Sequence, residues 1–158
     1  MPGVSGRVVL ITGASRGIGA AAAKLFLDGG AKVMAVSRSE DDLAATGFLP
    51  HYFAADLSTM DGCRAAVDAT ERILGPIDIL VCNHGVGSAA EVPLHETDVE
   101  QFKHSMATNL DGPFYLTRLV LPGMVKRRYG RCVYTSSTAA IDAEHAAVGY
   151  NTSKVSKI

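Results

Sequence analysis

The feature that most constrains the fold is a regular alternation of short apolar runs with segments of helical length. Apolar, mostly β-branched runs predict five strands, at residues 7–11, 32–37, 51–55, 77–82 and 131–135. Helices are expected between them, at residues 17–27, 39–45, 58–74 and 97–128, and a last helix begins near residue 147. Most of these strands are apolar along their whole length, which is typical of a parallel sheet buried on both faces.

Parallel strands joined by right-handed helical crossovers give a doubly wound α/β fold, and we expect the strand order 3-2-1-4-5. The chain has 158 residues, so residues 1–158 are expected to form a single domain. In the long helical segment 97–128 we expect a disturbance at Pro122 and Gly123, because proline has no amide hydrogen to donate.

Charge and cysteine usage exclude several classes of function. The formal net charge of -1 argues against nucleic acid or an anionic membrane as a partner. Cys63, Cys82 and Cys132 lie far apart in the sequence, so neither a disulfide framework nor a zinc site is expected, and we expect no metal. With no run of about 18 apolar residues and no secretory leader, the protein is expected to be cytoplasmic.

The first predicted loop carries three glycines in the sequence TGASRGIG. Glycine allows the backbone angles of a tight turn and lets the main chain approach a pyrophosphate closely, while the helix that follows presents free N–H groups to the anion. We expect contacts to a dinucleotide from Gly13, Ser15, Arg16, Gly17, Ile18 and Gly19. The spacing GxxxGxG departs from the commoner GxGxxG, and a glycine cluster by itself also fits a tight turn without a ligand.

The residues after the second predicted strand indicate which dinucleotide is preferred. Enzymes that use NAD favour a carboxylate here, which holds the ribose 2′-hydroxyl, whereas NADP requires cations for its 2′-phosphate. This strand ends in Ser37 and Arg38, and Glu40 is the first carboxylate that follows. Arg16 can approach the same point, so two guanidinium groups could clamp one phosphate. The pair favours NADP(H), although either arginine alone could be a solvated surface charge.

Tyr150 and Lys154 lie four residues apart, on one face of the last predicted helix. A nearby ammonium stabilises a phenolate, so Tyr150 could donate a proton to a carbonyl oxygen or accept one from an alcohol. A tyrosine and a lysine with this spacing also meet by chance on many helices. Two further residues support a site: Ser137 follows the fifth strand, and Asn109 occupies a mid-helix position that its low helix propensity disfavours.

With these motifs in place, the whole chain resembles the short-chain dehydrogenase/reductase family, from TGASRGIG to Lys154. In that family Asp56 and Leu57 correspond to the adenine contact, and Asn83 and Gly85 match two positions of an NNAG motif. Asn109, in TNLDGPF, matches the helix asparagine of the family. Ser137 lies thirteen residues before Tyr150, which is the family's spacing.

The resemblance implies a Rossmann-type, NADP(H)-dependent oxidoreductase that interconverts a carbonyl and an alcohol, with a ketone or a 3-oxoacyl compound as substrate. Ser137 would bond the substrate oxygen, Tyr150 would be the acid or base, Lys154 would bind the nicotinamide ribose and assist Tyr150, and Asn109 would hold a relay water. For the full-length form, a homo-oligomer that pairs through the helices around Asn109 and Tyr150 is also implied. The alternative is an NADP(H)-binding fragment or regulator without turnover.

Two departures from the family pattern stand out. His84 replaces the alanine of NNAG, and it could be a second proton donor, a substrate contact or a tolerated loop variant. Family members are also longer, so we expect this chain to be truncated at its C-terminus. The last strands and the substrate lid of the family would then be missing, and the fifth strand would be an exposed edge.

Overall fold

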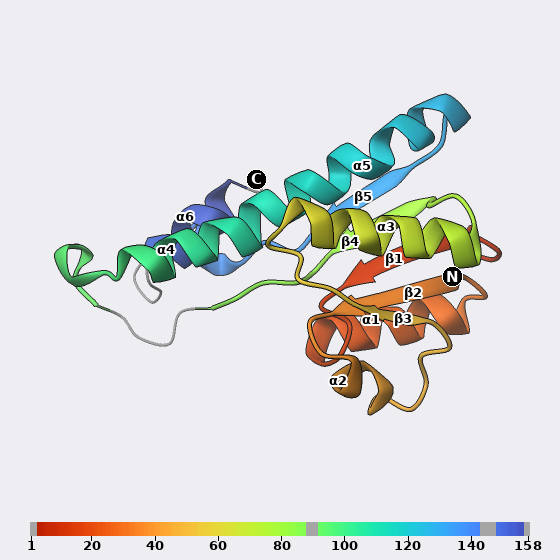
Figure 1. Ribbon diagram of the computed structural model, residues 1–158, viewed down its shortest axis with the longest axis horizontal. Coiled ribbons are helices and arrows are strands. Elements are labelled where there is room, and N and C mark those ends of the chain that lie inside the picture. The colour runs from red at the N-terminus through yellow and green to blue at the C-terminus, as the bar shows by residue number, and fades with distance from the viewer. Residues whose placement is uncertain (1–2, 88–91, 143–147, 157–158) are drawn as a thin grey trace.

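The computed structural model describes residues 3–87, 92–142 and 148–156, which form one parallel sheet in the order β3-β2-β1-β4-β5 (Figure 1). Its strands are β1 Val8–Thr12, β2 Lys32–Ser37, β3 Tyr52–Ala54, β4 Ile79–Cys82 and β5 Arg131–Tyr134. All four strand pairings are parallel. The predicted fold class and strand order are therefore confirmed.

The helices are α1 Gly17–Asp28, α2 Glu40–Ala44, α3 Met60–Leu74, α4 Val99–Met106, α5 Gly112–Arg127 and α6 Val148–Val155. Two 3₁₀ turns, η1 Leu94–Glu96 and η3 Thr138–Ala140, and one π-helical turn, η2 Ala107–Asp111, complete the described elements. Side-chain caps set three of the helix starts, because Ser39 Oγ accepts from the amide of Asp42, Thr59 Oγ1 from that of Gly62 and Asp98 Oδ1 from that of Glu100. No helix of the described residues is long and apolar enough to span a membrane.

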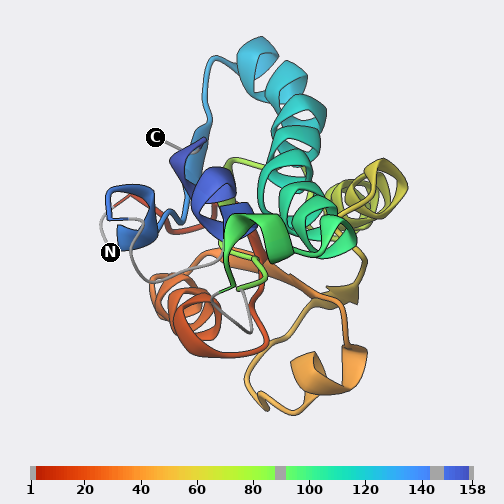
Figure 2. The ribbon, with the colours of Figure 1, turned by 90° about the vertical axis from the view of Figure 1, so that its left-hand side faces the viewer.

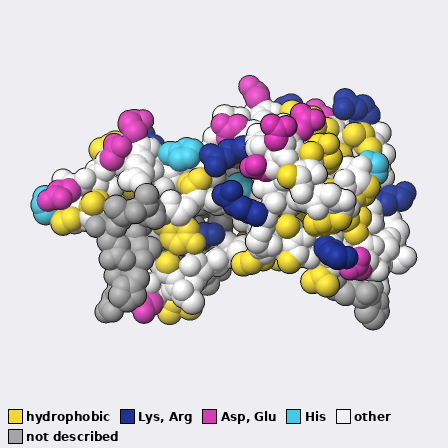
Figure 3. Space-filling view, turned by 90° about the horizontal axis from the view of Figure 1, so that it is seen from below, with side chains coloured by type: hydrophobic (Ala, Val, Ile, Leu, Met, Phe, Trp, Pro, Cys, Tyr) yellow, Lys and Arg dark blue, Asp and Glu magenta, His cyan; other side chains and the backbone are white. Residues whose placement is uncertain are grey.

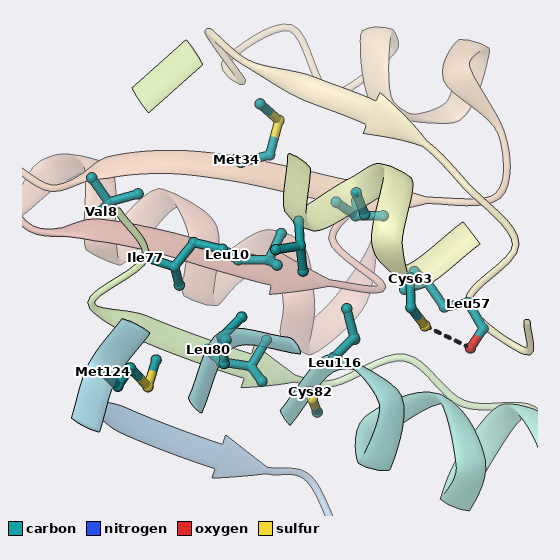
Figure 4. Packing of buried hydrophobic residues seen from close by; sticks show 14 residues of the cluster. Val8, Leu10, Met34, Leu57, Cys63, Ile77, Leu80, Cys82, Leu116 and Met124 are labelled. Carbon is teal, nitrogen blue, oxygen red and sulfur yellow. Dashed lines mark hydrogen bonds between the residues drawn. The ribbon is translucent and has the colours of Figure 1, made fainter. Parts of the chain in front are cut away.

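Alternate residues of the central strands face two separate cores, as expected for a doubly wound sheet. Val8 and Leu10 pack with residues of α3 and α5, and Figure 4 shows Leu10 among Leu80, Leu116 and their neighbours. Val9 and Ile11 point to the opposite face, where α1 covers them. Figure 2 shows α1 on one side of the sheet and α3 with α5 on the other. The two layers of helices bury β1 and β4 along their whole length.

The long helix expected at residues 97–128 is interrupted, but at a different place from the one predicted. It divides at the π turn Ala107–Asp111, whereas Pro122 lies inside α5 without ending it. Pro122 is on the exposed side of α5, so the main-chain carbonyl that loses the hydrogen bond proline cannot donate lies toward water. The prediction of a disturbance at Pro122 and Gly123 was therefore wrong. The real interruption surrounds Asn109, and π turns of this kind frequently mark functional sites.

β5 forms one edge of the described sheet, as predicted. It pairs only with β4 among the described strands, and Val133 and Tyr134 are 49% and 37% exposed. The central strand β1, by contrast, is buried along its whole length. The contrast arises because helices cover both faces at the middle of the sheet, while the described chain leaves one face of β5 uncovered.

Candidate active site

A cleft of about 450 Å³ lies at the carboxyl ends of the central strands. At this point one crossover leaves β1 toward β2 and another reaches β4 on the opposite side, which is where open α/β sheets bind ligands. Figure 3 shows a hollow near the middle of one face of the molecule, with Lys or Arg side chains beside it. The cleft is lined by Gly13, Ser15, Arg16, Ser37, Arg38, Ser39, Asp42, Ala55, Asp56, Leu57, His84, Gly85 and Thr108.

The glycines of the first loop shape the wall between β1 and α1. Gly13 and Gly17 have φ angles of +66° and +55°, which side chains disfavour, and a Cβ at Gly19 would collide with the carbonyl oxygen of Gly13. Helix α1 has no side-chain cap and no acidic residue in its first turn. Its first N–H groups and the positive end of its dipole thus suit a phosphate, so the loop fits a dinucleotide.

The end of β2 meets the same loop. Ser15 and Ser37 are joined by a hydrogen bond of 3.2 Å between their hydroxyl oxygens, and Arg16 and Arg38 are exposed on either side of this pair. Arg16 and Arg38 both belong to the lining of the cleft, as does Asp42. The structure therefore brings the two predicted arginines into the lining of one cleft.

The loop after β3 contributes Asp56 and Leu57. The hydroxyl and the amide of Ser58 both donate to Asp56 Oδ1, at 2.7 and 3.0 Å. These two bonds lower the pKa of Asp56, and the positive charges of Arg38 and His104 add to the effect, which outweighs the opposing influence of burial. Asp56 is therefore a carboxylate at neutral pH, while Leu57 is buried in the core.

The loop after β4 holds Asn83, His84 and Gly85. Asn83 ties neighbouring strands together, because its Nδ2 donates to the Gly13 carbonyl at 3.3 Å and its Oδ1 accepts from Thr135 Oγ1 at 3.2 Å. The ring of His84 contacts Thr12, and a Cβ at Gly85 would lie 3.1 Å from Asn109 Oδ1. Any side chain at Gly85 would thus crowd Asn109.

Asn109 lies in the π turn and is completely buried. Its Oδ1 accepts from the amide of Val86 at 2.8 Å, and its Nδ2 donates to the carbonyl of Val86 and to Ser153 Oγ, each at 3.0 Å. These bonds join the loop after β4 to α6. The low helix propensity that singled out Asn109 is therefore compensated by tertiary hydrogen bonds.

Lys154 is 4% exposed, although lysine is seldom buried. Its Nζ donates to the carbonyl of Thr135 at 3.0 Å and lies 5.4 Å from the centre of the Tyr150 ring. A Cβ at Gly85 would be 3.6 Å from the same Nζ. The ammonium is thus held between α6, the end of β5 and the loop after β4, where it stabilises negative charge that develops nearby.

Ser137 begins the short turn η3, and its Oγ accepts from the amide of Ala139 at 3.2 Å. This turn packs against α6, which carries Tyr150 and Lys154. Helix α6 also packs closely on α4, since a Cβ at Gly149 would lie 3.2 Å from Ser105 Cβ. Ser137, Asn109, Tyr150 and Lys154 therefore come from adjacent elements.

The structure differs from the sequence analysis over which residues face the cleft. Gly17, Ile18, Gly19 and Asn83 shape or border the first loop but do not line the cleft. The predicted catalytic residues, Asn109, Ser137, Tyr150 and Lys154, do not line it either. The cleft includes four residues that were not predicted: Ser39, Asp42, Ala55 and Thr108. The role of Thr135 as the acceptor for Lys154 was also missed, because a main-chain carbonyl has no signature in the sequence.

A doubly wound sheet with a glycine loop at its switch point is the architecture of dinucleotide-binding proteins. The family model described as short chain dehydrogenase matches residues 7–157. The chain therefore belongs to the short-chain dehydrogenase family.

Its relatives differ in substrate and in cofactor. A 2-dehydro-3-deoxy-L-rhamnonate dehydrogenase (NAD(+)) from Sphingomonas sp. (strain SKA58) is 33% identical, over 98% of this chain and 63% of the relative. An acetoacetyl-CoA reductase from Paracoccus denitrificans is 38% identical, over 83% of this chain and 54% of the relative. The crystal structure of a blue fluorescent protein from a metagenomic library in complex with NADPH matches with a TM-score of 0.84 and 30% identity, over 98% of this chain and 65% of that one.

The chain thus spans between about half and two thirds of the length of the relatives it matches.

Proposed function

We propose that this protein is an NADP(H)-dependent oxidoreductase that interconverts a carbonyl group and an alcohol, with Tyr150 as proton donor or acceptor. The observation that carries the proposal is the buried ammonium of Lys154, 5.4 Å from the centre of the Tyr150 ring. Burying a lysine ammonium costs free energy unless an opposite charge or hydrogen bonds compensate for the lost water. A phenolate at Tyr150 would be such an opposite charge.

Each residue has a defined part in this proposal. The dinucleotide, when bound, would supply or accept the hydride. Tyr150 would give its phenolic proton to the substrate oxygen in reduction and take it back in oxidation, while Lys154 stabilises the phenolate. Ser137 would hold the substrate oxygen by a hydrogen bond. Asn109 would keep the loop after β4 in place and, as the family resemblance implies, hold a water that relays the proton.

The preference for NADP(H) rests on charge at the end of β2. Arg16 and Arg38 line the cleft beside Ser37, where a carboxylate would favour NAD. A 2′-phosphate there would neutralise the two exposed guanidinium groups, whereas the 2′-hydroxyl of NAD would not. The relatives support either cofactor, since one is named for NAD(+) and another was solved with NADPH. A comparison of the affinities for NADPH and NADH tests this preference.

For substrates we propose ketones and 3-oxoacyl thioesters, a choice supported by the similarity to an acetoacetyl-CoA reductase. We also propose a cytoplasmic homo-oligomer that pairs through the helices around Asn109 and Tyr150. Phe114, Leu121 and Val125 on α5 are exposed, so that helix has apolar surface available for a partner.

Oxidation of NADPH in the presence of a panel of ketones and 3-oxoacyl thioesters tests the proposal, together with fluorescence titration of NADPH. We expect turnover that Tyr150→Phe abolishes without loss of NADPH binding, while the matched control Tyr52→Phe retains activity. Binding without turnover on any substrate would favour the alternative, an NADP(H)-binding protein. Full activity in Tyr150→Phe would refute the assigned mechanism.

A further inference from the structure

The cleft contains a carboxylate that the proposed function leaves without a role. Its charged lining residues are two arginines, Arg16 and Arg38, and two aspartates, Asp42 and Asp56. Asp56 already accepts two hydrogen bonds from Ser58. Asp42 is different, because within the described part of the chain no ion pair joins it to either arginine. Figure 3 shows acidic and basic side chains close to one another beside the hollow.

The local structure of helix α2 fixes Asp42 at the wall of the cleft. Its amide donates to Ser39 Oγ at 3.1 Å, which caps the helix, and the next residue, Leu43, is completely buried in the core. An aspartate side chain is short, so its carboxylate lies within about 4 Å of its own Cα. Asp42 therefore cannot move its negative charge far from the cleft.

A smaller hollow beside the cleft brings Asp42 together with one of the arginines. It has a volume of about 260 Å³ and is lined by Ser15, Arg16, Asp42, Ala45 and Thr46. A sphere of that volume is roughly 8 Å across, which is shorter than the Debye length of about 10 Å at 0.1 M salt. An anion that Arg16 binds at this place is therefore also repelled by Asp42, because the two residues carry opposite charges.

We propose that Asp42 is a specificity-determining residue, whose negative charge opposes the 2′-phosphate of NADP(H) and so limits the preference that the two arginines create. This inference rests on the proposed function, since it assumes that the 2′-phosphate binds at Arg16 and Arg38. A phosphate monoester carries a charge of about −1.5 to −2 at pH 7, whereas NAD(H) has a neutral hydroxyl at the same position. The charge of Asp42 therefore lowers the affinity for NADPH and has little effect on the affinity for NADH.

Fluorescence titration with NADPH and with NADH tests the inference, at pH 8 and about 0.05 M salt, where screening is weak. Asp42→Asn keeps the shape of the side chain and removes its charge, and it should raise NADPH affinity about threefold. Asp42→Lys changes the charge by two units in place of one, so it should raise NADPH affinity about ninefold. Both variants should bind NADH as the wild-type chain does.

Asp41→Asn is the matched control, because Asp41 is the neighbouring exposed carboxylate of α2 and is not among the described residues that line the cleft. This variant should keep the wild-type affinity for NADPH. Salt gives a second measurement. At about 1 M salt the Debye length is about 3 Å, so the difference between Asp42→Asn and the wild-type chain should disappear. Circular dichroism shows whether each variant is folded.

Several results would overturn the inference while leaving the proposed function intact. Wild-type NADPH affinity in both Asp42 variants would show that the charge does not act on the 2′-phosphate. An equal gain in Asp41→Asn would show a general effect of net charge. A loss of NADH affinity in Asp42→Asn would show that Asp42 binds the ribose itself. Failure of the folded wild-type chain to bind either dinucleotide would instead overturn the proposed function.

Discussion

Replacement of Asn109 by alanine is expected to destabilise the fold as well as the site. The substitution removes three hydrogen bonds from a fully buried side chain: one from the Val86 amide, one to the Val86 carbonyl and one to Ser153 Oγ. At about 1 kcal/mol for each bond, the free energy of unfolding falls by about 3 kcal/mol. In a domain of this size that loss lowers the melting temperature by roughly 6–12 °C.

Urea denaturation followed by circular dichroism measures the loss directly. Ser153→Ala is the matched control, because it removes one of the three bonds of Asn109 together with the bond from Ser153 Oγ to the Tyr150 carbonyl, and it should cost about 2 kcal/mol. A loss for Asn109→Ala below 1 kcal/mol, or no larger than that of Ser153→Ala, would refute the assignment of Asn109 as the link between the loop after β4 and α6.

Three further predictions concern the phosphate loop, the cofactor and the core. Gly19→Ala places a Cβ against the Gly13 carbonyl and should weaken NADPH binding at least tenfold by fluorescence titration. Arg38→Ala should lower NADPH affinity about 10- to 100-fold and leave NADH affinity nearly unchanged in the same assay. Burial, with a smaller effect of the Asp56 charge, raises the pKa of Cys63 from 9.0 to about 12. The protonated thiol is favoured in the folded state, so its contribution is complete below pH 9 and is lost as the pH rises toward 12, a decline that Cys63→Ala should reduce in urea denaturation.

Each of these predictions has a result that would contradict it. For the loop, wild-type NADPH affinity in Gly19→Ala would mean that the turn adjusts at little cost. Equal losses for NADPH and NADH in Arg38→Ala would show that the residue does not read the 2′-phosphate. For the core, identical alkaline profiles of the wild-type chain and Cys63→Ala would show that the thiol does not titrate differently in the folded and unfolded states.

Much of the fold could be predicted because its signals are local. The strand patterns and the position of the glycine loop were sufficient to predict the order of the strands in the sheet. Parallel strands joined by right-handed crossovers can be ordered in only a few ways. The ends of the helices were predicted to within two residues where a side-chain cap such as Ser39 marks them. The π turn around Asn109 was missed, because its hydrogen bonds run to Val86 and Ser153, which are distant in sequence.

The predicted site was recovered in part. Most of the residues expected to hold the dinucleotide surround one cleft, and their role in binding stays a prediction. Asp42 was missed because it belongs to no motif and reaches the cleft only through the packing of α2 on β2 and β3. Thr108 was missed although it begins the segment TNLDGPF, because only its neighbour Asn109 was singled out there. His84 was noticed as a departure, but its hydrogen bond to Thr12 could not be predicted, because it joins the ends of two strands and residues that lie 72 positions apart in the sequence.

The sequence by itself determined that this chain forms a parallel, doubly wound sheet with a phosphate-type loop at its centre, because apolar periodicity and glycine placement act over a few residues. Only the tertiary structure decided how the site is held. The burial of Lys154 against the Thr135 carbonyl, the anchoring of Asn109 and the hydrogen bond between His84 and Thr12 each depend on groups from separate elements. Such contacts satisfy polar groups that folding takes out of water, and their partners are known only once the elements have packed.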